Sequence, residues 1–332
     1  MVIRSEHNQA GIGISQNLAG GAQSSMMHVD GEPRERQLAT STGGGTTMVV
    51  ASIVSVQFGA AVAKQLFADV GPAGVVLLRQ GIAAIVLVAV TRPRIRGRDT
   101  GDWIVVFAFG AVLAAMNLTF YEAVARLPLG LAVTIELLGP LGLAVALSRR
   151  RQEFGWCALA CAGVLLLGEG GSSIDSIGVV FAVVAAACWA GYILLVGAAG
   201  RRFVGVDGLA LAMVAASLMS SPFGLRAGRS LVAPRALALG ALVAMLSAIV
   251  PFSLEVTARR RVAPGAFGVL MSLSPAVATA SGFIVLHQHL TMQQLAGMAL
   301  VATASAATIV STRRRDAERA RPTAPGSPRR RR

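Results

Sequence analysis

The feature that most constrains this chain is a series of ten apolar runs between residues 47 and 311. A helix needs about 20 apolar residues to cross the hydrocarbon core of a bilayer, which is about 30 Å thick. Backbone groups in lipid must pair internally, so each run predicts a helix. The runs are 47–68, 72–91, 103–125, 128–148, 154–170, 178–199, 207–223, 235–257, 264–286 and 292–311.

The composition agrees with spans in lipid. Hydrophobic residues make up 54% of the 332 residues, charged residues only 14%, and the mean hydropathy is +0.65. A soluble domain carries about 25% charged residues. We therefore predict an all-α membrane protein with ten transmembrane helices.

The positive charges predict the orientation of these helices. The formal net charge is +14. Of the 30 Lys and Arg residues, 24 lie in the two tails or in the connections predicted on the same side of the membrane as the tails, and four lie in the connections on the other side. Such an asymmetry places both termini in the cytoplasm of a multi-pass protein of the cell (inner) membrane. Nucleic acid is excluded as a partner because no aromatic residues are interleaved with the arginines as a base-stacking surface requires.

Polar segments flank the apolar region. Residues 1–45 are rich in Gly, Ser and Gln and are expected to form a disordered cytoplasmic tail. Residues 312–332 are expected to form a basic cytoplasmic tail with affinity for anionic lipid.

A weak internal repeat divides the chain into two halves of five helices, 46–170 and 176–311. The stretch "RLPLGLAVTIELLGPLGLAVAL" from 126 resembles "RVAPGAFGVLMSLSPAVATASG" from 261. Five spans separate the two stretches, and because five is odd, the halves lie in opposite orientations. Inverted repeats are typical of secondary transporters, with the substrate site near the midplane at the repeat interface.

Five ionisable residues, Lys64, Arg79, Glu122, Glu136 and Glu255, fall within the predicted spans. A charge at the bilayer centre costs about 2.5–3.5 kcal/mol on insertion scales, so each needs a partner, a cavity or a route to the interface. Glu122 and Glu255 lie near span ends, where an interfacial carboxylate paired with nearby arginines is an alternative to a functional role. Lys64 lies near the outer end of its span and could extend to the interface.

Arg79 and Glu136 are predicted to lie at the same depth. Each follows a proline that opens its span, by seven residues from Pro72 and by eight from Pro128. At 1.5 Å per residue, both lie about 10–12 Å below the outer edge. We predict that they face a shared cavity, as a pair or with substrate between them; a purely structural buried salt bridge is the alternative.

Prolines and aromatic residues supply further candidates. Pro140 and Pro275 lie inside spans, where proline kinks a helix and frees the carbonyl four residues earlier, so polar backbone is expected beside Glu136. Side chains that could line the cavity, or anchor at the interface instead, are Asn117, Tyr121, Trp189 and Tyr192.

The sequence gives no sign of an enzyme. It has no phosphate-binding G-x-x-x-x-G-K-[ST] motif, and "TGGGTT" at 42–47 lacks its lysine. His287 and His289 are too few for a metal site, and Cys157, Cys161 and Cys188 lie in apolar runs where packing is expected. We therefore expect no cofactor, no metal and no catalytic residue.

Four stretches carry a resemblance to a known family: "AKQLFADVGPAGVVLLRQGIAA", "MNLTFYEAVARLPLGLAVTIELLGPLGLAVALSRRR", "AACWAGYILLVG" and "VPFSLEVTARRRVAPGAFGVLMSLSPAVATASGFIVL". From about 46 to 312 the chain resembles the drug/metabolite transporter superfamily with two EamA-type repeats, and more narrowly the bacterial threonine/homoserine exporters. The resemblance implies proton-driven export of small solutes through a central cavity. The positions that match are Lys64, Arg79, Tyr121, Glu136, Pro140, Trp189, Tyr192, Glu255 and Pro275.

The chain departs from these exporters at two places. Ser274 stands before Pro275 where they typically have a glutamate, and "LHQHL" at 286–290 replaces their usual L-G-E-x-L. The first departure leaves Glu136 as the only glutamate in the paired pre-proline regions and puts the family's substrate in doubt.

These observations predict a secondary exporter of small amino acids or related metabolites that works by proton antiport and alternating access of two inverted halves. The substrate ammonium would contact Glu136 and its carboxylate Arg79 or Lys64. A multidrug exporter of the same fold is one alternative, and a non-transporting membrane scaffold is another. The sequence leaves open whether the unit is a monomer or a homodimer.

Overall fold

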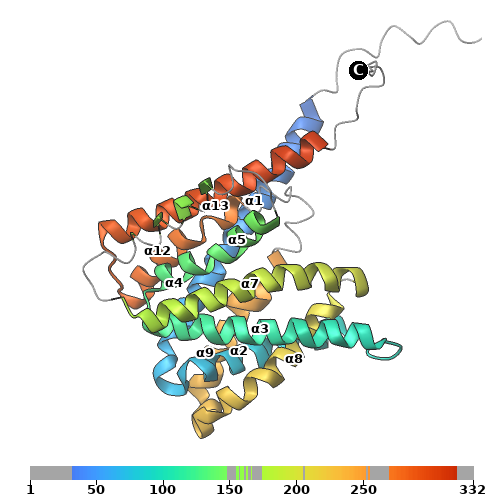
Figure 1. Cartoon of the computed structure of the whole chain (residues 1–332). Coiled ribbons are helices and arrows are strands. Elements are labelled where there is room, and N and C mark those ends of the chain that lie inside the picture. The colour runs from blue at the N-terminus through green and yellow to red at the C-terminus, as the bar shows by residue number, and fades with distance from the viewer. Residues whose placement is uncertain are drawn as a thin grey trace, which may run out of the picture. The chain divides into compact units, whose positions relative to one another are not determined.

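A computed structural model describes residues 32–147, 174–204, 206–251 and 269–319, with a few isolated positions at 155–166 and at 253 and 254. Within these ranges the chain is helical and contains no strand, which confirms the all-helical prediction (Figure 1). Met1–Gly43 and Gly44–Arg332 are separate compact units. The helices that pack together belong to the second unit, and only the first residues of α1 lie in the first.

The described helices differ widely in length. In chain order they are α1 Glu32–Gln65, α2 Phe67–Thr91, α3 Thr100–Arg126, α4 Leu129–Glu136, α5 Leu138–Leu147, α7 Ser176–Arg202, α8 Asp207–Gly224, the 3-10 helix η1 Leu225–Val232, α9 Pro234–Ala244, the π-helix η2 Met245–Ile249, α12 Ser274–Leu286 and α13 Met292–Arg319. Helix α1 already begins at Glu32, inside the segment for which the sequence predicted a disordered tail; its first residues, "EPRERQLA", include several good helix formers.

Seven of the described helical segments are long and apolar enough to cross a membrane. They correspond to seven of the predicted spans, which are 47–68, 72–91, 103–125, 128–148, 178–199, 207–223 and 264–286. Pro234–Ile249 is a shorter apolar helix within the predicted span 235–257, and α13 covers the predicted span 292–311. The predicted span 154–170 lies almost wholly outside the described residues, so the number ten stays a prediction.

Local sequence explains where several helices begin. Asp99 accepts a hydrogen bond from the backbone N–H of Asp102 at 2.6 Å and so caps α3. Asp175 caps α7 in the same way through the N–H groups of Ile177 and Gly178. Aspartate is one of the preferred N-cap residues because its carboxylate satisfies N–H groups that the first turn leaves unpaired.

Helices from the two predicted repeats pack on each other. Helix α3 lies along α7 and α8, α2 lies along α8 and α9, and α4 packs against α12 (Figure 1). Small residues allow these close contacts: a Cβ at Gly110 would overlap the side chain of Ala215, and one at Gly224 would overlap Leu77. Small residues at contacts are typical of helices that associate in membranes, where van der Waals packing replaces the hydrophobic effect.

Ion pairs join helix ends that the predicted topology places on the same side. Arg202 at the end of α7 lies 3.2 Å from Asp102 at the start of α3, and Arg98 lies 3.5 Å from Asp207 at the start of α8. On the opposite side, Arg235 lies 3.3 Å from Asp69. These pairings agree with the predicted order of connections.

Candidate functional site

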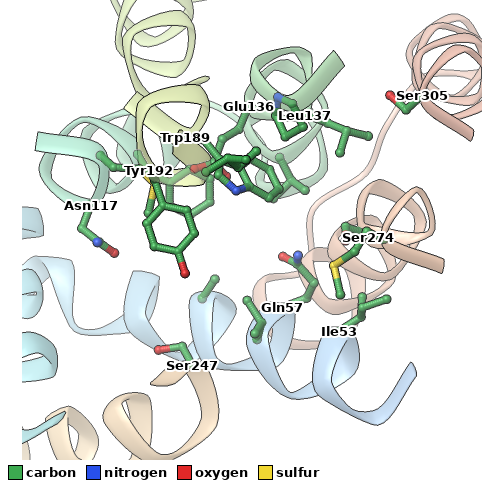
Figure 2. Close-up of a pocket in the computed structure, with 18 of the residues that line it drawn as sticks. Ile53, Gln57, Asn117, Glu136, Leu137, Trp189, Tyr192, Ser247, Ser274 and Ser305 are labelled. Carbon is green, nitrogen blue, oxygen red and sulfur yellow. The ribbon is translucent and has the colours of Figure 1, made fainter. Parts of the chain in front are cut away.

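A cavity of about 650 Å³ lies among the helices of both predicted repeats (Figure 2). Residues of α1, α2, α3, α4, α5, α7, η2, α12 and α13 line it. Its polar lining residues are Ser52, Gln57, Arg79, Asn117, Glu136, Ser247, Ser274, Ser305 and Thr308, and its aromatic lining residues are Phe120, Tyr121, Trp189 and Tyr192.

Glu136 reaches the cavity because its helix ends there. Helix α4 stops at Glu136, Leu137 forms a turn, and α5 begins at Leu138. Pro140 has no N–H, so the α-helical donor for the Glu136 carbonyl is missing. The break between α4 and α5 therefore lies beside the cavity, and the polar backbone expected there from the Gly-Pro pair stays a prediction.

Gly139 holds the break against a neighbouring helix. A Cβ at this position would overlap the backbone carbonyl of Ala186 in α7. Only glycine allows two backbones to approach so closely. Helix α7 also supplies Trp189 and Tyr192 to the cavity, so this contact fixes Glu136 relative to the aromatic side chains (Figure 2).

Arg79, on α2, faces the same cavity and is held by neutral groups. One guanidinium nitrogen donates to Asn117 Oδ1 on α3, and another donates to the Ser247 carbonyl at 3.2 Å. The guanidinium carbon lies 5.8 Å from the ring centroid of Tyr121, a cation–π distance. The Nε of Arg79 is buried without a hydrogen-bond partner.

The carbonyl that holds Arg79 is available because of a second proline. In an α-helix the Ser247 carbonyl would accept from the nitrogen of residue 251, which is a proline without an N–H. One residue earlier the helix is already in π register, since the N–H of Val250 bonds to the Met245 carbonyl. The skipped Leu246 carbonyl accepts instead from Ser55 Oγ of α1 at 2.6 Å.

This π-helix explains why the predicted span 235–257 is not one regular helix. Single-turn π segments occur mostly as insertions in α-helices and are frequent at functional sites. Here the segment turns two carbonyls away from the helix, one towards α1 and one towards Arg79.

Arg79 and Glu136 share the cavity without forming an ion pair. Both side chains line it. Among the described residues, no nitrogen of Arg79 lies within 4.0 Å of a carboxylate oxygen. A cation and an anion that face one cavity without contact leave room for a ligand that carries both charges.

Of the other predicted site residues that the structure describes, four line the cavity and two do not. Tyr121, Trp189, Tyr192 and Pro140 line the cavity, whereas Pro275 is the second residue of α12 and only its neighbour Ser274 lines the cavity. Lys64 is not a lining residue: its Nζ donates to the Leu127 carbonyl at 2.9 Å, at the end of α3.

The two remaining carboxylates lie elsewhere. Glu122 pairs with Arg126 at 3.4 Å, one turn along α3, and does not line the cavity, which fits the interfacial alternative. Glu255 falls outside the described residues, so its predicted role stays a prediction.

Sequence reasoning missed the uncharged polar lining residues. Ser52 and Gln57 on α1, Ser247 on η2 and Ser305 and Thr308 on α13 all face the cavity. The signal was their spacing: Ser305 and Thr308 are three residues apart, which places both on one face of a helix.

A second cavity of about 180 Å³ adjoins the first. Six residues line both cavities: Val56, Arg79, Met116, Asn117, Tyr192 and Ser247. Beyond these residues the second cavity runs along α2 and α8 past Leu87 and Met213. Arg79 therefore lines both cavities.

Comparison with known proteins gives the family. Residues 176–310 match the EamA-like transporter family. The threonine/homoserine exporter RhtA of Escherichia coli (strain K12) is 38% identical over 272 residues, which cover 80% of this chain and 92% of that protein. The chain belongs to the EamA-like transporter family.

Further similarity agrees with this membership. The threonine/homoserine exporter RhtA of Salmonella typhimurium (strain SL1344) is 37% identical over 272 residues, again 80% of this chain and 92% of that protein. A crystal structure with 17% sequence identity superposes with a TM-score of 0.53 over 82% of this chain and 98% of its own, which shows a shared fold. As an EamA-like transporter with seven described helices fit to cross a membrane, the chain is a multi-pass membrane transporter and not an enzyme.

Proposed function

We propose that this chain is a secondary exporter of small amino acids that resemble threonine and homoserine. The observation that carries the proposal is the placement of Arg79 and Glu136 on one cavity, without contact between their charges. Relatives named threonine/homoserine exporters, at 38% and 37% identity over most of the chain, support the substrate class.

The two charges suit the two ends of a zwitterion. The Arg79 guanidinium is held only by neutral acceptors, so a substrate carboxylate would be its counter-ion. Glu136 offers its carboxylate to the substrate ammonium. Hydrogen bonds to charged groups are roughly twice as strong as neutral ones, so this pair would dominate binding.

Glu136 also gives the exporter a site for proton coupling. Protonation removes the negative charge that attracts the ammonium, whereas Arg79 stays charged at any physiological pH. A proton that enters from outside would therefore displace the substrate, and deprotonation towards the cytoplasm would restore the site. This exchange is proton antiport through one shared carboxylate.

The proposed topology is ten helices in two inverted EamA repeats, 46–170 and 176–311, with both termini in the cytoplasm. The family match over residues 176–310 coincides with the second repeat. In this topology Ala144, Met271 and Thr308 lie near the cytoplasmic ends of their spans, so the cavity reaches the cytoplasmic half. An exporter must load its substrate from that side.

Alternating access would use the interrupted helices. Helices of both predicted repeats are packed closely where α3 meets α7 and α8, so rocking of the two halves would have to change these contacts. The turn at Leu137 and the π-helix η2 interrupt regular helices beside the cavity, and movement would concentrate there.

Exchange in proteoliposomes tests the proposed function. Purified protein should exchange labelled L-threonine across the membrane, and an inward proton gradient should accelerate its export. L-homoserine should compete. If neither amino acid is transported or competes, the proposal is wrong.

A second candidate, export of larger amphipathic cations, is favoured by the aromatic wall of the cavity. This wall consists of Phe120, Tyr121, Trp189 and Tyr192, and the rings of Phe120 and Tyr121 pack with centroids 5.9 Å apart. Such a wall beside Glu136 fits a cation, but Arg79 would then have no ligand. Competition between ethidium and L-threonine separates the two candidates. Only an exporter of larger cations is expected to transport ethidium and not threonine.

A further inference from the structure

We propose that Lys64 and Gln288 form an outer latch, two side chains that hold the start of α4 against its neighbours and keep the cavity closed towards the outside. The inference rests on the proposed exporter and its topology, and it names the residues whose bonds must break before the substrate can leave. It also gives Lys64 a role away from the substrate.

Helix α4 is short and is interrupted at both ends. Leu127 before it has extended backbone, and Leu137 after it forms the turn to α5. The last residue of α4, Glu136, lines the cavity, whereas the first, Leu129, lies at the outer end of the predicted span 128–148. Because element ends are where hinge movements occur, α4 can shift as a unit and link the cavity to the outer side.

Gln288 supplies the cap that the start of α4 lacks. The first N–H groups of a helix have no partner within it, and the N-cap residue, Pro128, makes no side-chain hydrogen bond. The Leu129 N–H donates instead to Gln288 Oε1 at 3.0 Å. Gln288 lies in the connection between α12 and α13, so this bond ties the start of α4 to the other predicted repeat.

The end of α12 positions Gln288. His287 follows α12 with a φ of 52°, in the left-handed region, and the Gln288 N–H donates to the Gly282 carbonyl at 3.1 Å. This is a common way for a helix to end, and it fixes the backbone of the residue that follows. A Cβ at Gly282 would overlap Gln288 Oε1, so the glycine leaves room for the side chain that reaches α4.

Lys64 holds the same part of the chain from α1. Its Nζ donates at 2.9 Å to the carbonyl of Leu127, directly before the start of α4. The next residue, Gln65, donates from Nε2 to the Val285 carbonyl of α12 at 3.3 Å. Hydrogen bonds to a charged group are the stronger ones, so the bond of Lys64 is the main part of the latch.

The latch covers a closely packed region. Leu127, Leu129 and Leu131 are at most 1% exposed and belong to one apolar cluster. A Cβ at Gly130 would overlap the side chain of Thr279 in α12. None of these leucines, nor Gly130, lines either cavity. In the proposed topology this packed region separates the cavity from the outside, so the latch holds the outer side closed.

Labelling of a cysteine behind the latch tests its state. Ala60 lines the cavity, so Ala60→Cys reports access to it, in the full chain with its three native cysteines replaced by alanine. A membrane-impermeant methanethiosulfonate reagent is added outside intact cells. We expect this parent protein to be labelled slowly, because the latch keeps the outer side closed.

Removing either latch residue should open the outer side more often. Gln288→Met should raise the rate of outside labelling about 2- to 10-fold, the shift in a two-state equilibrium that the loss of one neutral hydrogen bond implies. Lys64→Met should raise it about 10- to 100-fold, because its bond has a charged donor. Gln288 is only half-buried, so its variant tests the latch even if Lys64→Met folds poorly.

Gln294→Met is the matched control. Gln294 lies in the first turn of α13, and its Oε1 accepts from the Thr291 N–H at 3.0 Å, so this bond stays within one segment. Its outside labelling rate should equal that of the parent. Inverted vesicles add a second control: opening of the latch should not raise labelling from the cytoplasmic side, whereas a general loosening raises labelling from both sides.

The outcomes separate the latch from the proposed function. The latch is overturned if Gln288→Met and Lys64→Met both label from outside at the parent rate, if Gln294→Met labels as fast as they do, or if labelling rises equally from both sides. Labelling needs no substrate. If outside labelling rises as expected but wild type exchanges no L-threonine, the latch stands and the proposed function fails.

Discussion

Two buried glutamines of this transporter show how differently the same side chain is used in two regions. Gln80, at 1% exposure, lies where α2, α3 and α8 meet: its Nε2 donates to the Leu113 carbonyl at 3.3 Å, and its Oε1 accepts from Ser220 Oγ at 2.9 Å. Gln57, at 6% exposure, lies on the cavity, and its Oε1 has no partner.

The difference marks the boundary between scaffold and site. Around Gln80 the polar groups are paired and glycines press helices together, so the region is suited to hold its shape. Beside the cavity that Gln57 lines, α4 ends at Glu136, the π-helix η2 interrupts a regular helix, and Gln57 Oε1 lacks a partner, so the region is suited to bind. Unpaired buried groups cost about 1–3 kcal/mol each, a cost that a ligand can remove.

The largest effect should come from Glu136→Gln, in the cavity region. Removing the charge that attracts the ammonium should lower L-threonine exchange by about 100-fold or more, the loss expected when a buried charged contact is removed. Proteoliposome exchange of equal amounts of folded protein measures it. Glu122→Gln is the control, because Glu122 pairs with Arg126 away from the cavity; equal losses in both variants would contradict the assignment.

The next effect concerns the packed region. Gly110→Ala places a methyl group against Ala215 and the Ala212 carbonyl of α8, so it should destabilise the fold by about 1–3 kcal/mol, the usual cost of overpacking. Thermal unfolding of the purified protein measures the loss. Gly142→Ala is the matched control, since a Cβ there meets nothing within 4 Å. Equal melting temperatures for the two variants would show that α3 and α8 are not tightly packed.

A smaller effect is expected from Pro251→Ala, at the edge of the two regions. The substitution supplies an N–H that can bond to the Ser247 carbonyl and compete with Arg79. Exchange of L-threonine should fall about 10-fold, since one hydrogen bond to a charged group is worth about 1.5–3 kcal/mol and the competition removes part of it. Pro222→Ala, in α8 and away from the lining residues, should leave exchange near wild type. A wild-type rate for Pro251→Ala would show that the freed carbonyl does not matter.

The smallest effect should come from Gln80→Met. It removes two hydrogen bonds between helices, each worth about 0.6 kcal/mol on average in a membrane protein, so stability should fall by about 1 kcal/mol. Exchange of L-threonine per folded molecule should stay near wild type. A loss of exchange as large as the one expected for Pro251→Ala would remove the distinction between the two regions.

The sequence predicted the helices well because their length is set by the bilayer and their apolar runs are continuous. It also predicted Arg79 and Glu136 as cavity residues, since charges are rare and costly in such runs. It did not predict Gln57 or Ser305, because uncharged polar residues are common in transmembrane helices and only the packing shows which ones lack partners. The π-helix at Met245–Ile249 was missed as well: Pro251 gave a reason for a break but not its register.

The arrangement of the two repeats was also beyond the sequence. An inverted repeat predicts two related halves, and movement of one half against the other follows naturally from it. The structure shows in addition that α3 of the first predicted half packs along α7 and α8 of the second. Contacts such as Gly110 with Ala215 depend on pairs of small residues far apart in the chain, and no single-sequence pattern identifies such pairs.

The central claim is that Arg79 and Glu136 hold the two ends of one zwitterion. The most direct measurement compares the affinity for L-threonine with that for L-threoninol, which lacks the carboxylate, in wild type and in Arg79→Met. Wild type should prefer threonine by about 100-fold, the loss expected for a charge left unpaired in a site, and Arg79→Met should bind both alike. An equal preference in wild type and variant would contradict the account.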